Sequence, residues 1–202
     1  MLRCLSGVVT GSGTIHYDGE KFNRGSIGLR RRIAFLPDFP VAFPYHTVLR
    51  HIGMVLRLYE ADRSAVEPRV SNLLRGFDLL PLVDTNISQL SRGQAYKAAL
   101  AALLAVDPEL LLLDEPFASG MDPNGITFLK QEARAAAARG HTVIYSTQIL
   151  DLAETLSDRV LIIERGQVRY YASLGELQGV APGHEGVSAL EQLFQQLRSG
   201  SR

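Results

Sequence analysis

The chain has 202 residues, 46% of them apolar and 21% charged, which is the composition of an ordinary folded domain. Twenty-one basic side chains balance twenty-one acidic ones, and this disfavours nucleic acid as a partner, because nucleic-acid-binding surfaces usually carry a basic surplus. A single cysteine, Cys4, excludes an internal disulfide framework, and no segment approaches the ~20 apolar residues of a membrane helix.

The first half of the chain predicts short strands followed by helices. Residues 13–19 alternate in polarity and end in Asp-Gly, which is typical of a strand that enters a tight turn. A short buried strand is expected over Ile33–Leu36. Apolar side chains recur at helical spacing over 47–59, and a second helix is expected over 63–77.

The second half alternates between helices and strands, which favours an α/β fold with a mostly parallel sheet flanked by helices. Helices are expected over 95–105, 124–139 and 151–156, and strands over 110–113, 142–147 and 160–163. The run of leucines in the first of these strands predicts burial on both faces. An amphipathic helix over 188–197 lies in a C-terminal tail at 180–202.

The first segment that suggests chemistry is Leu-Ser-Arg-Gly-Gln at 90–94. Ser91 followed three residues later by Gln94 predicts a capping box at the start of a helix. A helix N-terminus offers unpaired N–H groups and a partial positive charge, which together favour an anion. From these residues alone, a well-capped helix without a ligand remains an alternative.

The second such segment is Asp-Glu-Pro, which directly follows the leucine strand. Asp114 and Glu115 are therefore expected at the carboxyl edge of the sheet, where α/β folds bind ligands. One carboxylate could hold Mg²⁺, a hard cation that prefers oxygen, and the other could orient or deprotonate a water. Alternatively, both could merely cap the following turn.

These two segments follow one another in the order in which an ABC-type ATPase domain carries its LSGGQ signature and its Walker B strand. The sequence resembles this family over nearly its whole length. Segments that resemble the family's D-loop, its switch region and the stretch after its P-loop lie at 119–122, 142–150 and 4–19. The resemblance implies a P-loop NTPase-like α/β fold, an inserted helical signature lobe at about 45–90 and a small antiparallel β portion.

The resemblance also implies that ATP and Mg²⁺ are bound between two subunits paired head to tail. The residues expected at the γ-phosphate held by the opposite subunit are Ser91, Arg92, Gly93 and Gln94. Asp114 would coordinate Mg²⁺, and Glu115 would be the general base that positions the hydrolytic water. Asp122 would contact the partner subunit across the dimer, beside the bound nucleotide.

Two residues depart from the family's pattern. Asp38 stands where the family usually has Gln; it could still offer an oxygen to Mg²⁺ near the nucleotide, or it could simply begin a turn. Gln148 stands at the catalytic switch position, where the family usually has His; it can hydrogen-bond a phosphate but cannot become cationic. Both changes suggest a modified hydrolytic site.

The phosphate-binding motif G-x-x-x-x-G-K-[ST] does not occur in the 202 residues. In the family it would come immediately before Met1, with the aromatic A-loop further upstream. We therefore expect a single ABC-type domain over 1–202 that is incomplete at its N-terminus and does not hold ATP normally by itself. A misplaced start of a working subunit is one explanation, and a degenerate domain is the other.

The expected function is that of the ATP-hydrolysing subunit of an ABC transporter, with export favoured over import. The alternative is an inactive domain that acts as a docking or regulatory partner. The resemblance implies two kinds of partner, a second ATP-binding subunit and integral membrane permease subunits. The permease would contact residues 39–57 and hold the chain on the cytoplasmic face of the cell membrane. Alternatively, the apolar side chains of that segment could belong to the core.

Overall fold

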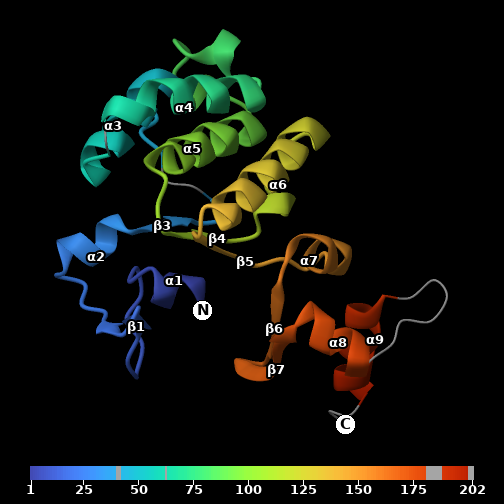
Figure 1. The fold of residues 1–202 in the computed structure, drawn as a ribbon. Coiled ribbons are helices and arrows are strands. Elements are labelled where there is room, and N and C mark those ends of the chain that lie inside the picture. The colour runs from blue at the N-terminus through green and yellow to red at the C-terminus, as the bar shows by residue number, and fades with distance from the viewer. Residues whose placement is uncertain (40–41, 62, 181–187, 200–202) are drawn as a thin grey trace. The chain divides into compact units, whose positions relative to one another are not determined.

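The structure is a computed structural model that describes residues 1–39, 42–61, 63–180 and 188–199. Its internal contacts divide the chain into two units, Met1–Ser146 and Thr147–Arg202. Each unit has its own sheet and helices (Figure 1).

A parallel sheet of three strands organises the first unit, in the order β3 (Ile33–Leu36), β4 (Leu110–Leu113) and β5 (Thr142–Tyr145). The strands pair in register, so that Leu113 lies between Leu36 and Tyr145. The last three leucines of β4 are at most 2% exposed, as the leucine run predicted for a central strand. All three strands therefore end at one edge.

One face of this sheet is covered by the long helices α5 (Arg92–Val106) and α6 (Pro123–Ala138), as Figure 1 shows. Helix α5 is rich in alanine and leucine and is buried on most sides, because α3 (Val48–Tyr59) and α4 (Arg63–Gly76) pack against its outer surface. Short 3-10 turns follow at Leu80–Leu82, Ile87–Gln89 and, after β4, Pro116–Ala118. Of these helices, α3 and α4 fall within the segment 45–90, where a helical lobe is expected, and α5 lies beyond it.

The other face of the sheet carries the N-terminal segment. Leu2, in the short helix α1 (Leu2–Leu5), packs with Ile33 and Leu112. The hairpin of β1 (His16–Tyr17) and β2 (Glu20–Lys21) turns through Asp-Gly, whose two φ angles of 51° and 81° suit a tight hairpin turn. Helix α2 (Ile27–Arg31) then leads into β3.

The second unit is an antiparallel hairpin packed on helices. Strands β6 (Arg159–Glu164) and β7 (Gln167–Ser173) pair across an Arg-Gly turn. The helices are α7 (Leu150–Leu156), α8 (Leu174–Val180) and α9 (Ala189–Ser199). Its core contains Ile162, Leu177 and Leu190, and the Leu190 amide donates a hydrogen bond of 2.7 Å to the Glu154 carboxylate.

The α/β class, the parallel sheet flanked by helices and the small antiparallel portion are confirmed. The strand expected over 13–19 is wrong in length: only His16–Tyr17 is a strand, because its partner β2 offers only two residues for pairing. Part of the predicted tail at 180–202, namely 181–187 and 200–202, lies outside the described residues. Within the described parts of the chain, no helix is long and apolar enough to cross a membrane.

Candidate functional site

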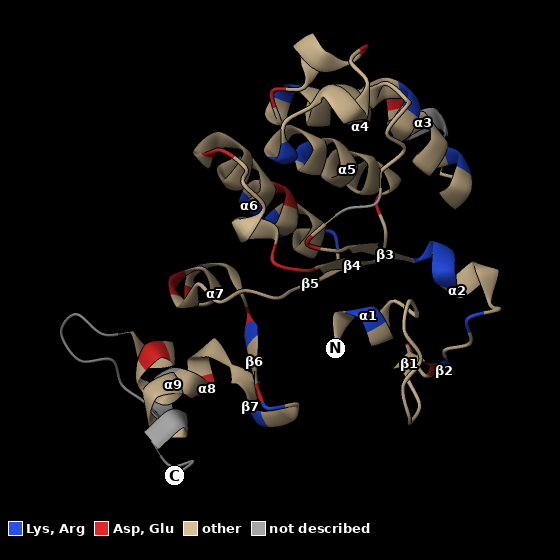
Figure 2. Ribbon diagram, turned by 180° about the vertical axis from the view of Figure 1, so that it is seen from behind, with Lys and Arg blue, Asp and Glu red and all other residues tan. Residues whose placement is uncertain are grey.

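The carboxyl edge of the three-stranded sheet brings together three of the predicted site residues and one residue, Ser146, that was not predicted. Asp38 follows β3, Asp114 and Glu115 follow β4, and Ser146 follows β5. Because parallel strands present their carboxyl ends at the same edge, the side chains that follow them come together there. Figure 2 shows acidic residues in the loop that leaves β4.

Ser146 organises the acidic pair. Its hydroxyl donates a hydrogen bond of 2.7 Å to Asp114 Oδ1, and it accepts one of 2.9 Å from the Glu115 amide. The Asp114 amide in turn donates to the Leu36 carbonyl at 2.9 Å. The Asp114 carboxylate and the backbone of both acidic residues are thus held by the two neighbouring strands.

Glu115 has a left-handed backbone, with φ 48° and ψ 48°. This conformation is uncommon for a residue with a long side chain and is found where the surroundings enforce it, often at functional sites. Here the enforcing contacts are the bond to Ser146 and the 3-10 turn that begins at Pro116. The backbone of Glu115 is therefore fixed directly after β4.

The acidic pair suits a hard cation in its chemistry, since Asp114 presents carboxylate oxygen at the sheet edge. Within the described residues, however, no group of three or more His, Cys, Asp or Glu side chains could hold a metal ion. Asp114 fits Mg²⁺ as one oxygen ligand of a site in which a substrate and water supply the others, which is the usual arrangement for this ion.

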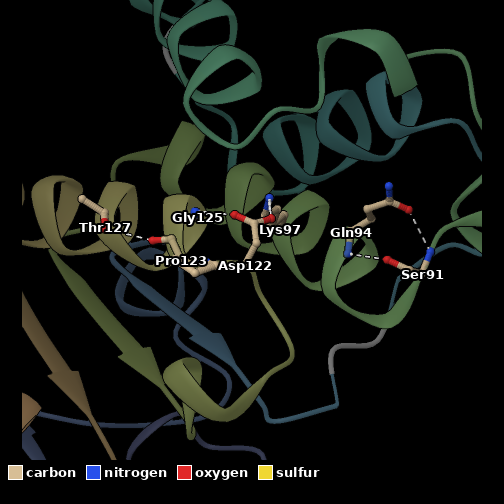
Figure 3. Close-up of polar contacts among 7 residues, drawn as sticks. All are labelled: Ser91, Gln94, Lys97, Asp122, Pro123, Gly125 and Thr127. Carbon is tan, nitrogen blue, oxygen red and sulfur yellow. Dashed lines mark hydrogen bonds and ion pairs between the residues drawn. The ribbon is translucent and has the colours of Figure 1, made fainter.

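The capping box at the start of α5 is confirmed. The Gln94 amide donates to the Ser91 hydroxyl at 3.2 Å, and the Ser91 amide donates to Gln94 Oε1 at 3.0 Å (Figure 3). The box pairs two of the groups at the helix end and leaves the other amides of the first turn without partners inside the helix. That arrangement favours an anion at this end.

The segment 119–122 packs directly against the first turn of α5. A Cβ atom at Gly93 would overlap the carbonyl oxygen of Gly120, so glycine is required for this approach. Gly120 itself has φ 84°, which also favours glycine. Ser119 is fully buried, and its hydroxyl donates to the Pro116 carbonyl at 2.8 Å.

Lys97 joins the same two segments by an ion pair with Asp122 (Figure 3). The lysine side chain is 5% exposed and Asp122 is 49% exposed. Asp122 also caps α6, because its Oδ1 accepts the Gly125 amide at 2.8 Å. The hydrogen bond from Lys97, followed by the one from the Gly125 amide, lowers the pKa of Asp122. Gly125 leaves room for the lysine, since a Cβ there would lie 2.6 Å from Lys97 Cε.

Asp38 faces the first turn of α5 from the other side. Arg92 Nη2 lies 3.3 Å from Asp38 Oδ1, and the Arg92 guanidinium carbon lies 4.5 Å from the centre of the Phe39 ring. The structure therefore brings Asp38 together with the segment 91–94. Gln148 belongs to the second unit, where it is exposed just before α7.

Three residues of this region were missed from the sequence: Ser146, Lys97 and Tyr96. The position of Ser146 could have been found, because it follows β5 as Asp114 follows β4. Lys97 was hidden in an alanine-rich helix, and only the three-dimensional contact with Asp122, 25 positions away, reveals it. Tyr96 is fully buried, but its hydroxyl has no hydrogen-bond partner in the described structure.

Comparison with known proteins decides the family. The family model described as ABC transporter matches residues 1–118, which is more than half of the chain. The chain belongs to the ABC transporter family. The match includes the signature-like segment at the start of α5 and the acidic pair after β4.

Relatives of this ABC protein include exporters and importers. The ABC-type transporter ATP-binding protein EcsA of Bacillus subtilis is 29% identical over 82% of the chain and 67% of its own length. The Nod factor export ATP-binding protein I of Paraburkholderia xenovorans is 31% identical over 82% of the chain and 55% of its own length. The sulfate/thiosulfate import ATP-binding protein CysA of Mycobacterium tuberculosis is 33% identical over 86% of the chain and 49% of its own length. The chain thus spans about half to two thirds of these relatives.

Solved structures show the same fold. The ATP-binding subunit of an ABC transporter is 27% identical, with a TM-score of 0.88 over 98% of this ABC chain and 81% of that one. The dimeric ATP-binding cassette MJ0796, bound to ADP and phosphate, is 22% identical, with a TM-score of 0.74 over 86% of this chain and 79% of that one. The second likeness concerns the fold alone.

Proposed function

We propose that the chain belongs to an ATP-hydrolysing subunit that powers an ABC transporter through a dimer with nucleotide at its interface. The observation that carries the proposal is the joining of two functional segments. The capped N-terminus of α5 and the acidic pair after β4 are connected by the segment 119–122, which touches Gly93 and is held by Lys97. An anion-binding helix end and a pair of carboxylates are the parts that phosphoryl transfer needs.

In this proposal the residues at the start of α5 receive the γ-phosphate of a nucleotide held by the partner subunit. They are Ser91, Arg92, Gly93 and Gln94. Asp122, exposed beside them, contacts the partner subunit. The helix end supplies amide donors and Arg92 adds a guanidinium, a group suited to phosphate.

The acidic pair carries the hydrolytic chemistry. Asp114 would hold Mg²⁺ through a carboxylate oxygen, and a bound ion would supply charge neutralisation at the phosphates. Glu115 orients a water and accepts its proton, for which its fixed backbone and the Ser146 contact give a defined position. Asp38 is a further oxygen donor near the nucleotide, and Gln148 is a hydrogen-bond donor to a phosphate oxygen.

The partners in this proposal are a second ATP-binding subunit and membrane permease subunits. Phe43, Tyr45 and Leu49 are between 37% and 86% exposed around the start of α3, and Phe39, after β3, is 68% exposed. Such exposed apolar side chains support a contact with the permease. That contact would hold the subunit on the cytoplasmic face of the cell membrane. Export is the direction that we propose, and transport by the reconstituted complex tests it.

The 202 residues contain no G-x-x-x-x-G-K-[ST] motif, so the hydrolysis test uses the protein in its native complex. Mg²⁺-dependent ATP hydrolysis is measured for the wild type, Glu115→Gln and, as a matched control, Glu20→Gln in the exposed strand β2. We expect Glu115→Gln to lose at least about 100-fold in rate, the usual contribution of a general base, and the control to lose nothing. Hydrolysis by Glu115→Gln at the wild-type rate would contradict the role of Glu115.

A second candidate function is an inactive docking partner. The observation in its favour is that Asp38, one of the proposed oxygen donors, is already paired with Arg92. A native complex whose hydrolysis is unchanged when Glu115 is replaced, but which disassembles without this subunit, would support the docking role in place of the catalytic one.

A further inference from the structure

Arg92 connects two segments that lie far apart in the sequence. It is the first residue of α5, and its side chain, 56% exposed, reaches across to the loop after β3. There it pairs with Asp38 at 3.3 Å and lies over the ring of Phe39 at 4.5 Å. An arginine above an aromatic face gains a cation–π attraction in addition to its ion pair, so two neighbouring residues of the loop are engaged by one side chain.

Tyr96 marks the same face of the helix one turn further on. Residues four apart in a helix are neighbours on its surface, so Arg92 and Tyr96 share one face. Tyr96 is fully buried and its hydroxyl has no hydrogen-bond partner within the described residues. Burial raises its pKa, and the charges of Asp38 and Asp114 raise it further. Its hydroxyl therefore stays protonated within the influence of both carboxylates.

The neighbouring face of α5 is bound to a different loop. Gly93 and Lys97, also four apart, contact Gly120 and Asp122 of the segment after β4. The first two turns of α5 thus carry one loop on each of two faces. In the ion pair with Asp122, the Lys97 side chain is buried. The ion pair between Arg92 and Asp38, in contrast, is accessible to water.

We propose that Arg92 is a positioning residue that holds Asp38 and Phe39 on α5, so that the loop after β3 and the segment 91–94 respond as one unit. The inference rests on the proposed function in one respect: it links the segment that we assign to phosphate with a carboxylate that we assign as an oxygen donor. A change in Arg92 at the helix end is therefore transmitted to Asp38 without passing through the sheet.

Global stability is a weak measure of such a pair, because an exposed ion pair changes the unfolding equilibrium constant by no more than about fivefold. Local signals are sharper. We would record ¹⁵N NMR spectra of the nucleotide-free chain as wild type, Arg92→Met and Asp38→Asn, with Arg24→Met as a control at an exposed arginine of another loop. The signals followed are the Arg92 Nε–H group and the amides of residues 38–39 and 91–94.

We expect reciprocal effects. Arg92→Met should shift the amides of Asp38 and Phe39 and speed their hydrogen exchange by about two- to fivefold, in line with the strength of an exposed pair. Asp38→Asn should shift the Arg92 Nε–H signal and the amides of 92–94. The double variant should show no changes in shift or exchange rate beyond those of the single variants. Arg92→Lys, which keeps the cation, should return the shift of the Asp38 amide at least part of the way to its wild-type value.

Two results would overturn the proposal. In the first, the amide shifts caused by Arg92→Met are confined to residues 91–96 and do not reach Asp38 or Phe39. In the second, Arg92→Lys shifts the Asp38 amide as far as Arg92→Met does. Because both variants change exposed side chains, we expect the fold to survive, and the unchanged amides of β4 report this in the same spectra. No nucleotide is present, so failure here leaves the proposed hydrolysis untouched. Reciprocal shifts in a subunit that hydrolyses no ATP would contradict the proposed function alone.

Discussion

Lys97 and Asp122 form an asymmetric pair, because the lysine is 5% exposed and the aspartate 49%. Removing the aspartate charge leaves a buried ammonium without a counter-charge, whereas removing the lysine leaves a carboxylate that water can solvate. We expect Asp122→Asn to lower the free energy of unfolding by about 1–3 kcal/mol, the cost of an unsatisfied buried group. Lys97→Met should cost less. Urea denaturation measures both.

The substitution Asp122→Asn is chosen because asparagine keeps the oxygen that accepts the Gly125 amide, and both residues are good helix caps. The control is Lys21→Met, which removes a lysine from the exposed strand β2 and should leave stability within about 0.5 kcal/mol. If Lys97→Met destabilised the chain more than Asp122→Asn, the assignment of the buried charge would be wrong.

The same pair predicts a dependence on pH. Since Lys97 and the Gly125 amide lower the pKa of Asp122, the ionised carboxylate favours the folded state. This contribution is fully present above the ordinary aspartate pKa of about 4 and is lost as the pH falls through the lowered pKa. The stability difference between wild type and Asp122→Asn should therefore shrink below about pH 4. A difference that stays constant between pH 6 and 2 would contradict the prediction.

At the scale of the elements, α5 is held closely to its neighbours through glycine. A Cβ at Gly93 would overlap the Gly120 carbonyl oxygen, whereas a Cβ at Gly53, inside α3, would meet nothing within 4 Å. Gly93→Ala should thus cost about 1–3 kcal/mol through overpacking. Gly53→Ala should stabilise by about 0.5–1 kcal/mol, because alanine is the better helix former.

Thermal or urea unfolding of these two alanine variants gives the comparison directly. Equal effects of the same sign would show that helix propensity alone decides both positions. The close approach of α5 to the segment 119–122 would then have no energetic importance.

Local patterns in the sequence predicted the elements well where they depend on near neighbours. The capping box identified the start of α5 from Ser91 and Gln94, and the leucine run identified β4. Contacts between distant residues were not predictable in this way. Arg92 and Asp38 are 54 positions apart, and nothing in the local pattern of either residue says that they meet.

At the scale of the whole molecule, the chain divides after Ser146 into two units with separate cores. Leu190 is 1% exposed in the core of the second unit. We expect Leu190→Ala to cost about 2–5 kcal/mol within that unit, as a large-to-small change in a core does. Hydrogen exchange should accelerate in α7, α8 and β6 while β4 stays protected.

Exchange that accelerates equally in β4 would show instead that both units unfold in one cooperative step. The division itself was not predicted, because alternating helices and strands are compatible with one continuous sheet. Which strands pair is decided by contacts across the whole fold. Family membership, in contrast, was predictable, since the signature-like segment and Asp-Glu-Pro stand in a fixed order along the chain.

Because the Lys97 side chain is buried, its reactivity with an acylating reagent reports whether α5 is still packed against the segment 119–122. The sequence has three lysines, Lys21, Lys97 and Lys130, and of these Lys21 is exposed and Lys130 is partly exposed. An amine-acylating reagent applied to the folded chain should therefore label Lys21 readily and spare Lys97. Any condition that separates α5 from the segment 119–122 should appear in a mass spectrum as acylation at Lys97, with Lys21 as the internal standard.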